Sequence, residues 1–211
     1  FIFPQADDGQ SRLVHAVERH PARTAEEGYR QKAAAESWQA LYENGAMFPA
    51  HYIDYSRTSS DMGDDRGLPF LKDVLLQALK VSRAGDIIVL TNDDTILHRG
   101  IGSVIRDSVR FGACSSHRCE YSQANPPDMT RADPFTSEAP HPGRDLFAFS
   151  TAWLATWWKL LPDFLLGAPC WDIALASFIR VSTGVKELVL QDAPVGPPNR
   201  YQQCFAREMP M

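Results

Sequence analysis

Four consecutive apolar residues at positions 87–90 lead through one threonine into Asn92, Asp93 and Asp94, and this junction limits the possible folds of the chain more than any other stretch. A continuous apolar run of this length between polar residues indicates a strand buried on both faces, as in the middle of a parallel sheet. Ligands of open α/β sheets bind beyond the carboxyl ends of the strands, where adjacent carboxylates favour a hard cation and the phosphates it carries. The alternative is that these residues cap a following helix, since Asn and Asp are preferred N-cap residues.

The length and net charge of the chain limit the number of domains and the kinds of ligand that it can bind. The chain has 211 residues, which suits one medium domain or at most two small ones, and 44% of its residues are hydrophobic, enough for a core. Its net charge of −5 argues against a broad nucleic-acid-binding surface and leaves only a locally basic groove open. The longest apolar region, residues 146–168, contains Lys159, Pro162 and Asp163, so no membrane span is expected.

Four cysteines, at positions 114, 119, 170 and 204, match no metal-binding spacing. In a chain of this size they indicate free thiols in a reducing compartment, and hence a cytoplasmic protein. A disulfide between Cys114 and Cys119 stays open as the alternative.

Hydrophobic periodicity predicts strands that alternate with helices along the chain. Residues 5–27 are interpreted as a polar connection, and 125–143 as a long loop. The predicted strands are 1–4, 48–55, the run at 87–90, 113–121, 145–150 and 187–191, and the predicted helices are 29–43, 69–81, 95–111, 152–161 and 171–181. This order favours an α/β fold with a mostly parallel central sheet flanked by helices in a single domain.

Three polar motifs follow one another in this pattern of elements. They are Asn92-Asp93-Asp94 after the buried run, Arg144-Asp145 at the start of a strand, and Trp171-Asp172 at the start of the last helix. Their order resembles that of the GT-A glycosyltransferases, which take a nucleotide sugar as donor. The resemblance implies one GT-A-like domain over residues 1–211, with 1–112 as the nucleotide-binding half and 113–211 as the acceptor and catalytic half.

The resemblance also implies a metal site. In that superfamily an Asp-X-Asp motif after a central hydrophobic strand holds a divalent metal on the donor diphosphate, and the matching ligands here are Asp94 and Asp93, with Mn²⁺ or Mg²⁺ as the cofactor. Asn92 replaces the first Asp of the usual motif, and its amide oxygen can coordinate a cation or hydrogen-bond a ribose but adds no charge. No histidine follows His141, so the C-terminal histidine that ligates the metal in many of these enzymes has no counterpart.

Asp172 is the catalytic base that the resemblance implies. An inverting transfer needs a base to remove the proton of the acceptor hydroxyl as that oxygen attacks the anomeric carbon. Trp171, directly before it, is the expected acceptor contact. The alternative for Asp172 is a helix N-terminal carboxylate that the macrodipole favours.

The remaining expected contacts are with the donor, for which a UDP-sugar is the expected compound. Arg144 is expected on the diphosphate and Asp145 on the sugar hydroxyls, although an ion pair at a strand entrance explains the same two residues. The other expected nucleotide and donor contacts are Arg57, Asp65, Arg66, Asn92 and Asp93. A lone loop charge at such positions is more often solvated than ligand-bound.

Two other functions stay open. A metal-dependent nucleotidyltransferase or phosphohydrolase would need Asp54, Asp64 and Asp65 to lie beside the carboxylates at 93 and 94. A non-catalytic nucleotide-sugar-binding protein would keep the fold without the chemistry. The acceptor is a hydroxyl compound whose class the sequence does not define, and nucleic acid is not favoured.

Overall fold

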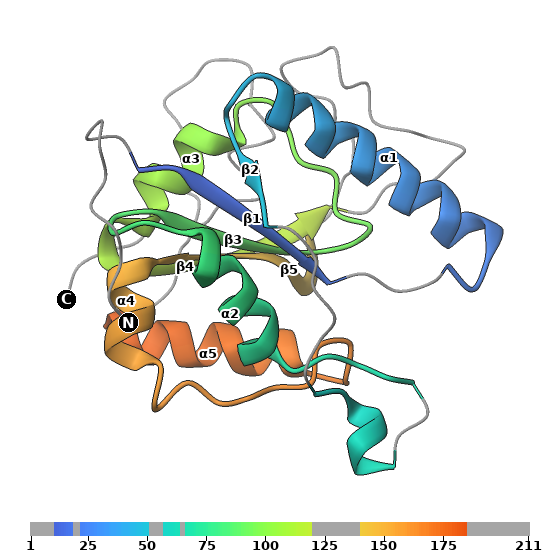
Figure 1. Ribbon diagram of the computed structural model, residues 1–211. Coiled ribbons are helices and arrows are strands. Elements are labelled where there is room, and N and C mark those ends of the chain that lie inside the picture. The colour runs from blue at the N-terminus through green and yellow to red at the C-terminus, as the bar shows by residue number, and fades with distance from the viewer. Residues whose placement is uncertain (1–10, 19–21, 51–56, 64–65, 120–139, 185–211) are drawn as a thin grey trace.

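The computed structural model describes residues 11–18, 22–50, 57–63, 66–119 and 140–184, and these form a sheet between two layers of helices (Figure 1). The strands are β1 (Leu13–Glu18), β2 (Phe48–Pro49), β3 (Ile87–Asn92), β4 (Ala113–Cys119) and β5 (Pro140–Ser150). The helices are α1 (Ala25–Glu43), α2 (Leu71–Val81), α3 (Ile101–Ser108), α4 (Thr151–Trp157) and α5 (Trp171–Thr183), with 3-10 turns η1 (Ser59–Met62) and η2 (Val109–Phe111).

The sheet has the strand order β2-β1-β3-β5-β4. β1 is parallel to both β2 and β3, whereas β5 runs antiparallel to β3 and to β4. The predicted α/β class is therefore confirmed, but the prediction of a mostly parallel sheet is wrong, because the sheet is mixed. β4 and β5 follow one another in the chain as antiparallel neighbours, an arrangement that needs no crossover helix and that hydrophobic periodicity does not distinguish from a parallel one.

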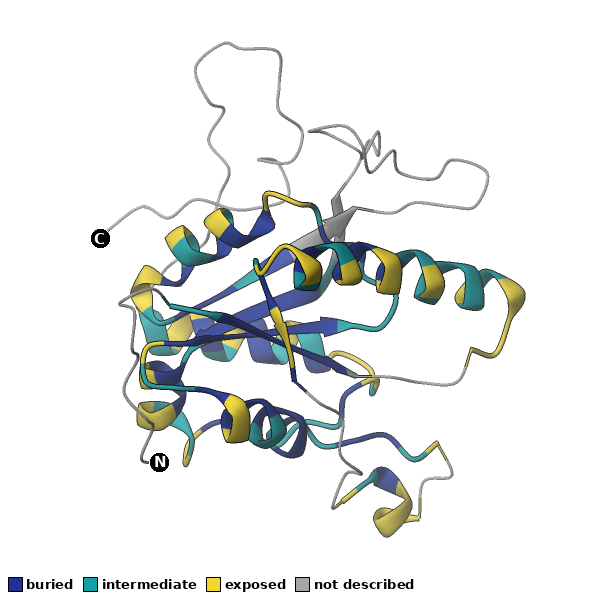
Figure 2. Ribbon diagram, turned by 45° about the horizontal axis from the view of Figure 1, so that its top comes forward, coloured by how far each residue is buried: buried dark blue, intermediate teal, exposed yellow. Residues whose placement is uncertain are grey.

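β3 has the character predicted for it, since both of its faces are buried. Ile87 and Val89 contact the side of the sheet covered by α1 and α3, while Ile88 and Leu90 contact the side covered by α2, α4 and α5. This alternation follows from the two-residue period of a strand. Figure 2 shows the buried sheet between helices whose outer faces are exposed.

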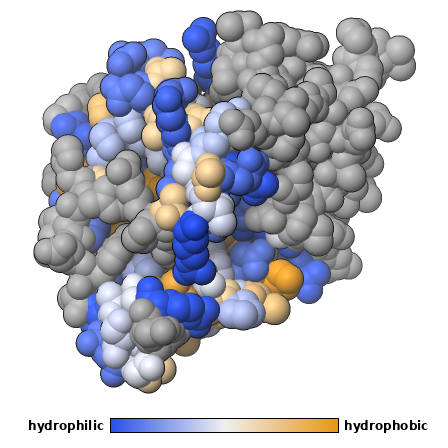
Figure 3. Space-filling model, turned by 90° about the vertical axis from the view of Figure 1, so that its right-hand side faces the viewer, coloured by the Kyte–Doolittle hydropathy of each residue, from blue (hydrophilic) through white to orange (hydrophobic). Residues whose placement is uncertain are grey.

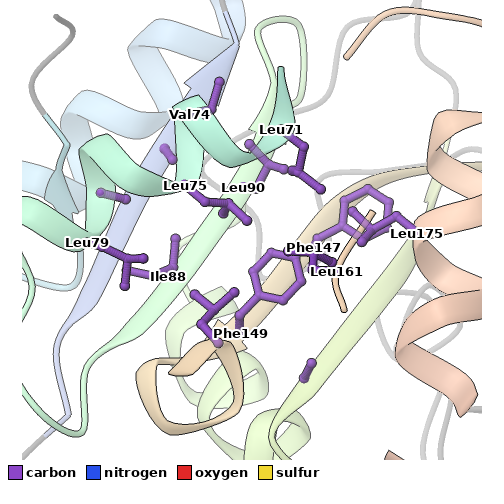
Figure 4. Close-up of a cluster of buried hydrophobic side chains, with 14 of the residues drawn as sticks. Leu71, Val74, Leu75, Leu79, Ile88, Leu90, Phe147, Phe149, Leu161 and Leu175 are labelled. Carbon is purple, nitrogen blue, oxygen red and sulfur yellow. The ribbon is translucent and has the colours of Figure 1, made fainter. Parts of the chain in front are cut away.

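On the second side, Ile88 and Leu90 meet the aromatic rings of Phe147 and Phe149 from β5 (Figure 4). Both rings are fully buried at 0% exposure. Burial of a side chain of this size contributes about 1.5–3 kcal/mol. The paired strands β3 and β5 thus share a buried cluster of side chains, and the acidic motif follows β3.

β1 was not predicted, because it lies within the stretch interpreted as a polar connection. His15 interrupts the apolar residues of this strand, yet it is only 1% exposed. Its ring nitrogens pair with Tyr42 Oη at 2.7 Å and Thr91 Oγ1 at 2.9 Å, so its burial leaves no polar group unsatisfied. A buried histidine with such partners behaves as a core residue, and the pattern of residue types alone does not reveal the partners.

The helices differ from prediction mainly at their ends. α1 begins four residues before the predicted start, at a capping box between Thr24 and Glu27, and ends as predicted at Asn44 and Gly45. α2 and α5 agree closely with prediction. α3 begins six residues later than predicted, and α4 ends at Trp157.

Some of the predicted strands lie wholly or partly outside the described residues. The strands predicted at 1–4 and 187–191 lie outside them, and of the strand predicted at 48–55 only β2 is described. β5 already begins at Pro140, within the predicted loop. Cys114 and Cys119 both belong to β4, but the side chain of Cys119 lies outside the described part of the chain, so the alternative disulfide between them stays a prediction. No helix within the described ranges is long and apolar enough to cross a membrane.

Candidate functional site

A polar pocket lies at the edge of the sheet where β1 and β3 end. The two strands are parallel and in register from Leu13 with Ile87 to Glu18 with Asn92, so their carboxyl ends meet. Figure 3 views the molecule from the side toward which these ends point, and hydrophilic side chains form a band across its described surface. The pocket has a volume of about 260 Å³ and is lined by Arg23, Glu27, Gln31, Arg66, Leu68, Asn92, Asp93, Asp94, Gly167 and Trp171.

The pocket has a half-buried floor and a charged rim. Asn92, Asp93 and Asp94 are half-buried, whereas Arg23 and Arg66 are exposed. Carboxylates on the floor and guanidinium groups at the rim are the charges that a cation and a phosphate, respectively, attract. The pocket can therefore receive a ligand that carries both.

The acidic motif does not cap a helix. α3 begins at Ile101, and its N-cap residue is Gly100. Asp93 and Asp94 precede that cap by six residues or more and belong to a loop. The capping alternative for these residues is therefore wrong, and their carboxylates face the pocket instead.

The second motif touches the first through a buried contact. Asn92 donates a hydrogen bond from Nδ2 to Asp145 Oδ1 at 2.9 Å, and Asp145 is only 6% exposed. Because the amide nitrogen is used in this bond, the amide oxygen of Asn92 points away from Asp145. The two residues are 53 positions apart in sequence, and the antiparallel pairing of β3 with β5 brings them together.

The third motif joins the second through the backbone. Arg144 donates its backbone N–H to Asp172 Oδ2 at 3.0 Å. Asp172 lies in the first turn of α5, where its charge also favours the helix macrodipole. The position thus fits the helix-terminus explanation, and the contact with β5 is one that a solvated helix end does not require. Asp172, Arg144 and Asp145 are not among the residues that line the pocket.

Trp171 lines the pocket but exposes little of its surface. It is 8% exposed, and its ring lies 5.3 Å from that of Phe147, between centroids. Most of the ring therefore belongs to the core, and only a small part of it can meet a ligand. Its predicted contact with an acceptor stays a prediction.

Of the residues predicted to contact the nucleotide, some line the pocket and others do not. Arg66 lines the pocket, whereas Asp65 lies outside the described residues. Arg57 is not among the lining residues, and it donates hydrogen bonds to Asp73 Oδ1 at 2.9 Å and to Asp163 Oδ2 at 2.7 Å. These bonds, with that to Asp73 the stronger influence, raise the pKa of Arg57 above its ordinary value.

Arg57 therefore links the segment before η1 to α2 and to the chain that precedes α5. Its guanidinium also lies 4.6 Å from the centroid of the Phe70 ring. A charge that two carboxylates already share is less available to a diphosphate than one without such partners. Its predicted donor contact is untested, but the geometry gives it a structural role as well.

Sequence analysis missed the α1 side of the pocket. Arg23, Glu27 and Gln31 are spaced four residues apart and line one wall. Residues four positions apart lie on one face of a helix. The capping-box pattern from Thr24 to Glu27 indicates that the helix begins there, which would have placed Glu27 and Gln31 on its first turns. The helix was instead predicted to begin at residue 29.

The donor set fits a cation bound together with a phosphate ligand. Among the described residues no group of three or more His, Cys, Asp or Glu side chains is arranged to hold a metal ion. Mg²⁺ is commonly held by one or two carboxylates, waters and substrate phosphates, and Asp93 and Asp94 supply the two carboxylates. The two-metal alternative needs more acidic ligands, and Asp54, Asp64 and Asp65 lie outside the described residues.

No protein-family model matches the chain, and comparisons with curated proteins and with solved structures find no match either.

Proposed function

We propose that the chain is a glycosyltransferase of GT-A-like fold, which moves a sugar from a nucleotide-diphosphate sugar to a hydroxyl acceptor. The observation that carries this proposal is the pair of hydrogen bonds from Asn92 to Asp145 and from Arg144 to Asp172. They unite three motifs from distant parts of the sequence beside a pocket of opposite charges. The expected donor is a UDP-sugar, held with Mn²⁺ or Mg²⁺.

The floor of the pocket receives the diphosphate in this proposal. Asp94, with Asp93, holds the cation, and Arg66 at the rim donates charge-assisted hydrogen bonds to phosphate oxygens. When bound, the cation supplies charge neutralisation for the diphosphate leaving group. Asp145 acts from its buried position by fixing the amide of Asn92, so that the amide oxygen is turned toward the ligand side.

Asp172 accepts the proton of the acceptor hydroxyl. Its Oδ2 is held by the backbone N–H of Arg144, so the carboxylate has a fixed orientation and Oδ1 is the atom that takes the proton. The transfer is then inverting, because the acceptor oxygen attacks the anomeric carbon directly. Trp171, next in the chain and at the pocket wall, borders the acceptor side.

The proposed location is cytoplasmic. Cys170 is an exposed free thiol, and thiols of this kind persist in reducing compartments.

The proposal is tested by a thermal-shift screen of UDP-, GDP- and TDP-sugars, each with and without Mn²⁺ or Mg²⁺. A bound donor stabilises the native state by mass action, by about 2.7 kcal/mol at a hundredfold excess over Kd. Stabilisation by one donor that depends on the cation is the expected result. No stabilisation by any nucleotide sugar, with or without metal, would overturn the proposal.

Asp172→Asn separates an enzyme from a binding protein. Loss of a general base lowers turnover by about 10²- to 10⁴-fold, while donor binding should be unchanged. Measurement of donor hydrolysis or transfer in both proteins decides the point. Donor binding without turnover in the wild-type protein would favour the non-catalytic alternative.

A further inference from the structure

α1 contacts the chain that follows β3 at three successive points. Gln31 donates from Nε2 to Asp93 Oδ2 at 2.9 Å, and Trp38 donates from Nε1 to the backbone oxygen of Thr95 at 2.8 Å. The backbone N–H of Leu97 donates to Ser37 Oγ at 3.1 Å. The loop at 93–97 is thus attached to one helix along its length, and Gln31 makes the contact nearest the acidic motif.

The helix that makes these contacts is itself fixed at both ends. At its start, Glu27 Oε2 accepts hydrogen bonds from the backbone N–H groups of Arg23 and Thr24, at 2.6 and 3.2 Å. In its second half, Trp38 and Leu41 are 2% and 0% exposed and pack against the sheet. Gln31 lies between these two anchors, so its side chain extends from a rigid support.

The hydrogen bond between Gln31 and Asp93 can have only one direction, with Gln31 as the donor. A carboxylate accepts hydrogen bonds, so the amide nitrogen of Gln31 must face it. The bond holds Oδ2 of Asp93 from the α1 side and so restrains the orientation of the carboxylate. Partners of this kind orient metal ligands, and their loss typically weakens metal binding by about 10- to 100-fold.

We propose that Gln31 is a positioning residue of the metal site, which holds the carboxylate of Asp93 in the orientation that binds the cation. This inference rests on the proposed function, because it requires a cation at Asp93 and Asp94. It extends that function to α1, a helix whose part in the site was not expected from the sequence. A residue in this role acts through its hydrogen bond to Asp93.

The test begins with direct Mn²⁺ binding, measured by electron paramagnetic resonance in the presence of saturating nucleoside diphosphate. Gln31→Met keeps the length of the side chain and removes the donor, and we expect about tenfold weaker Mn²⁺ binding. Gln39→Met is the matched control, because Gln39 lies on the same helix and donates to Glu43 Oε1 at 3.0 Å on the exposed surface. We expect that control to bind Mn²⁺ as the wild-type protein does.

A double-mutant cycle separates positioning from a general structural effect. In an Asp93→Ala background the acceptor of the Gln31 hydrogen bond is removed, so adding Gln31→Met should change Mn²⁺ affinity by less than about twofold. An equal tenfold loss in both backgrounds would contradict the proposal. If Asp93→Ala abolishes Mn²⁺ binding altogether, the difference between the Gln31 and Gln39 variants decides the question.

Thermal unfolding without metal checks that the variants are folded. Gln31→Ala serves as a second variant if Gln31→Met folds poorly, since Ala has the highest helix propensity. If the wild-type protein binds no Mn²⁺ with any nucleoside diphosphate, the proposed function fails. If it binds Mn²⁺ and both Gln31 variants bind equally well, only the positioning role of Gln31 is wrong.

Discussion

The two ends of β3 carry carboxylates that have opposite environments. At the amino end, Asp86 is 1% exposed and accepts hydrogen bonds from the backbone N–H groups of Arg12 and Arg83 and from the guanidinium of Arg12, the shortest at 2.6 Å. At the carboxyl end, Asp93 and Asp94 are half-buried and line a pocket. A neutral amide from Gln31 contacts the first of them.

The difference separates a structural carboxylate from a candidate ligand. A buried carboxylate that is saturated by donors contributes to the native state and has no coordination left to offer. Asp93 and Asp94, in contrast, are half-buried and line a pocket large enough for a ligand. The strand is one continuous element, so the contrast arises from what each end contacts.

The largest expected effect belongs to the amino end. Asp86→Ala should lower the free energy of unfolding by about 3–5 kcal/mol, because it leaves the Arg12 guanidinium and the surrounding N–H groups without their buried partner. Urea unfolding measures this loss. A change below about 1 kcal/mol would show that the two ends of β3 do not differ as described.

The carboxyl end should give the reverse pattern. Asp94→Ala is expected to weaken metal-dependent donor binding by about 100-fold, which corresponds to about 2.8 kcal/mol. The free energy of unfolding without ligand should change by less than about 0.5 kcal/mol. Calorimetric titration measures donor affinity, and urea unfolding of the same protein measures the free energy of unfolding. A large loss of stability with unchanged donor binding would show that Asp94 is a structural carboxylate.

Asn92 lies between the two extremes, since it borders the pocket and also satisfies a buried carboxylate. Asn92→Ala should destabilise the protein by about 1.5–2 kcal/mol, because Asp145 loses a charge-assisted hydrogen bond. Asn44→Ala is the control, as Asn44 accepts its bond from Ala46 N–H on the exposed surface. Equal losses of the free energy of unfolding in the two variants would mean that the buried hydrogen bond to Asp145 stabilises the protein no more than the exposed one.

The smallest effects should distinguish two arginines. Arg66→Ala is expected to weaken donor binding by about tenfold through loss of a charge-assisted phosphate contact. Arg57→Ala should instead lower stability by about 1 kcal/mol or less, because its ion pairs are half-exposed. Donor titration of both variants tests the distinction, and a stronger binding loss for Arg57→Ala would restore the donor contact predicted for it from sequence.

The sequence predicted those features that depend on local pattern. The burial of β3, the α/β class and the presence of α2 and α5 follow from apolar periodicity, and the structure has all of them. Hydrogen bonds from Asn92 to Asp145 and from Arg144 to Asp172 link the three polar motifs in space. Their chemical roles stay predictions.

The features that the sequence did not predict depend on distant partners. His15 interrupts β1 in the sequence, and its acceptability in the core comes from Tyr42 and Thr91, which are 27 and 76 positions away. The delayed start of α3 has the same origin. Bonds from α1 hold the preceding loop in a non-helical path.

An anomalous diffraction measurement on crystals grown with Mn²⁺ and UDP tests the central claim most directly. The account predicts one Mn²⁺ peak within about 2.5 Å of a carboxylate oxygen of Asp94, with phosphate oxygens completing its coordination. A Mn²⁺ site at Asp86 or elsewhere, or UDP bound in the pocket without Mn²⁺ at Asp94, would contradict it.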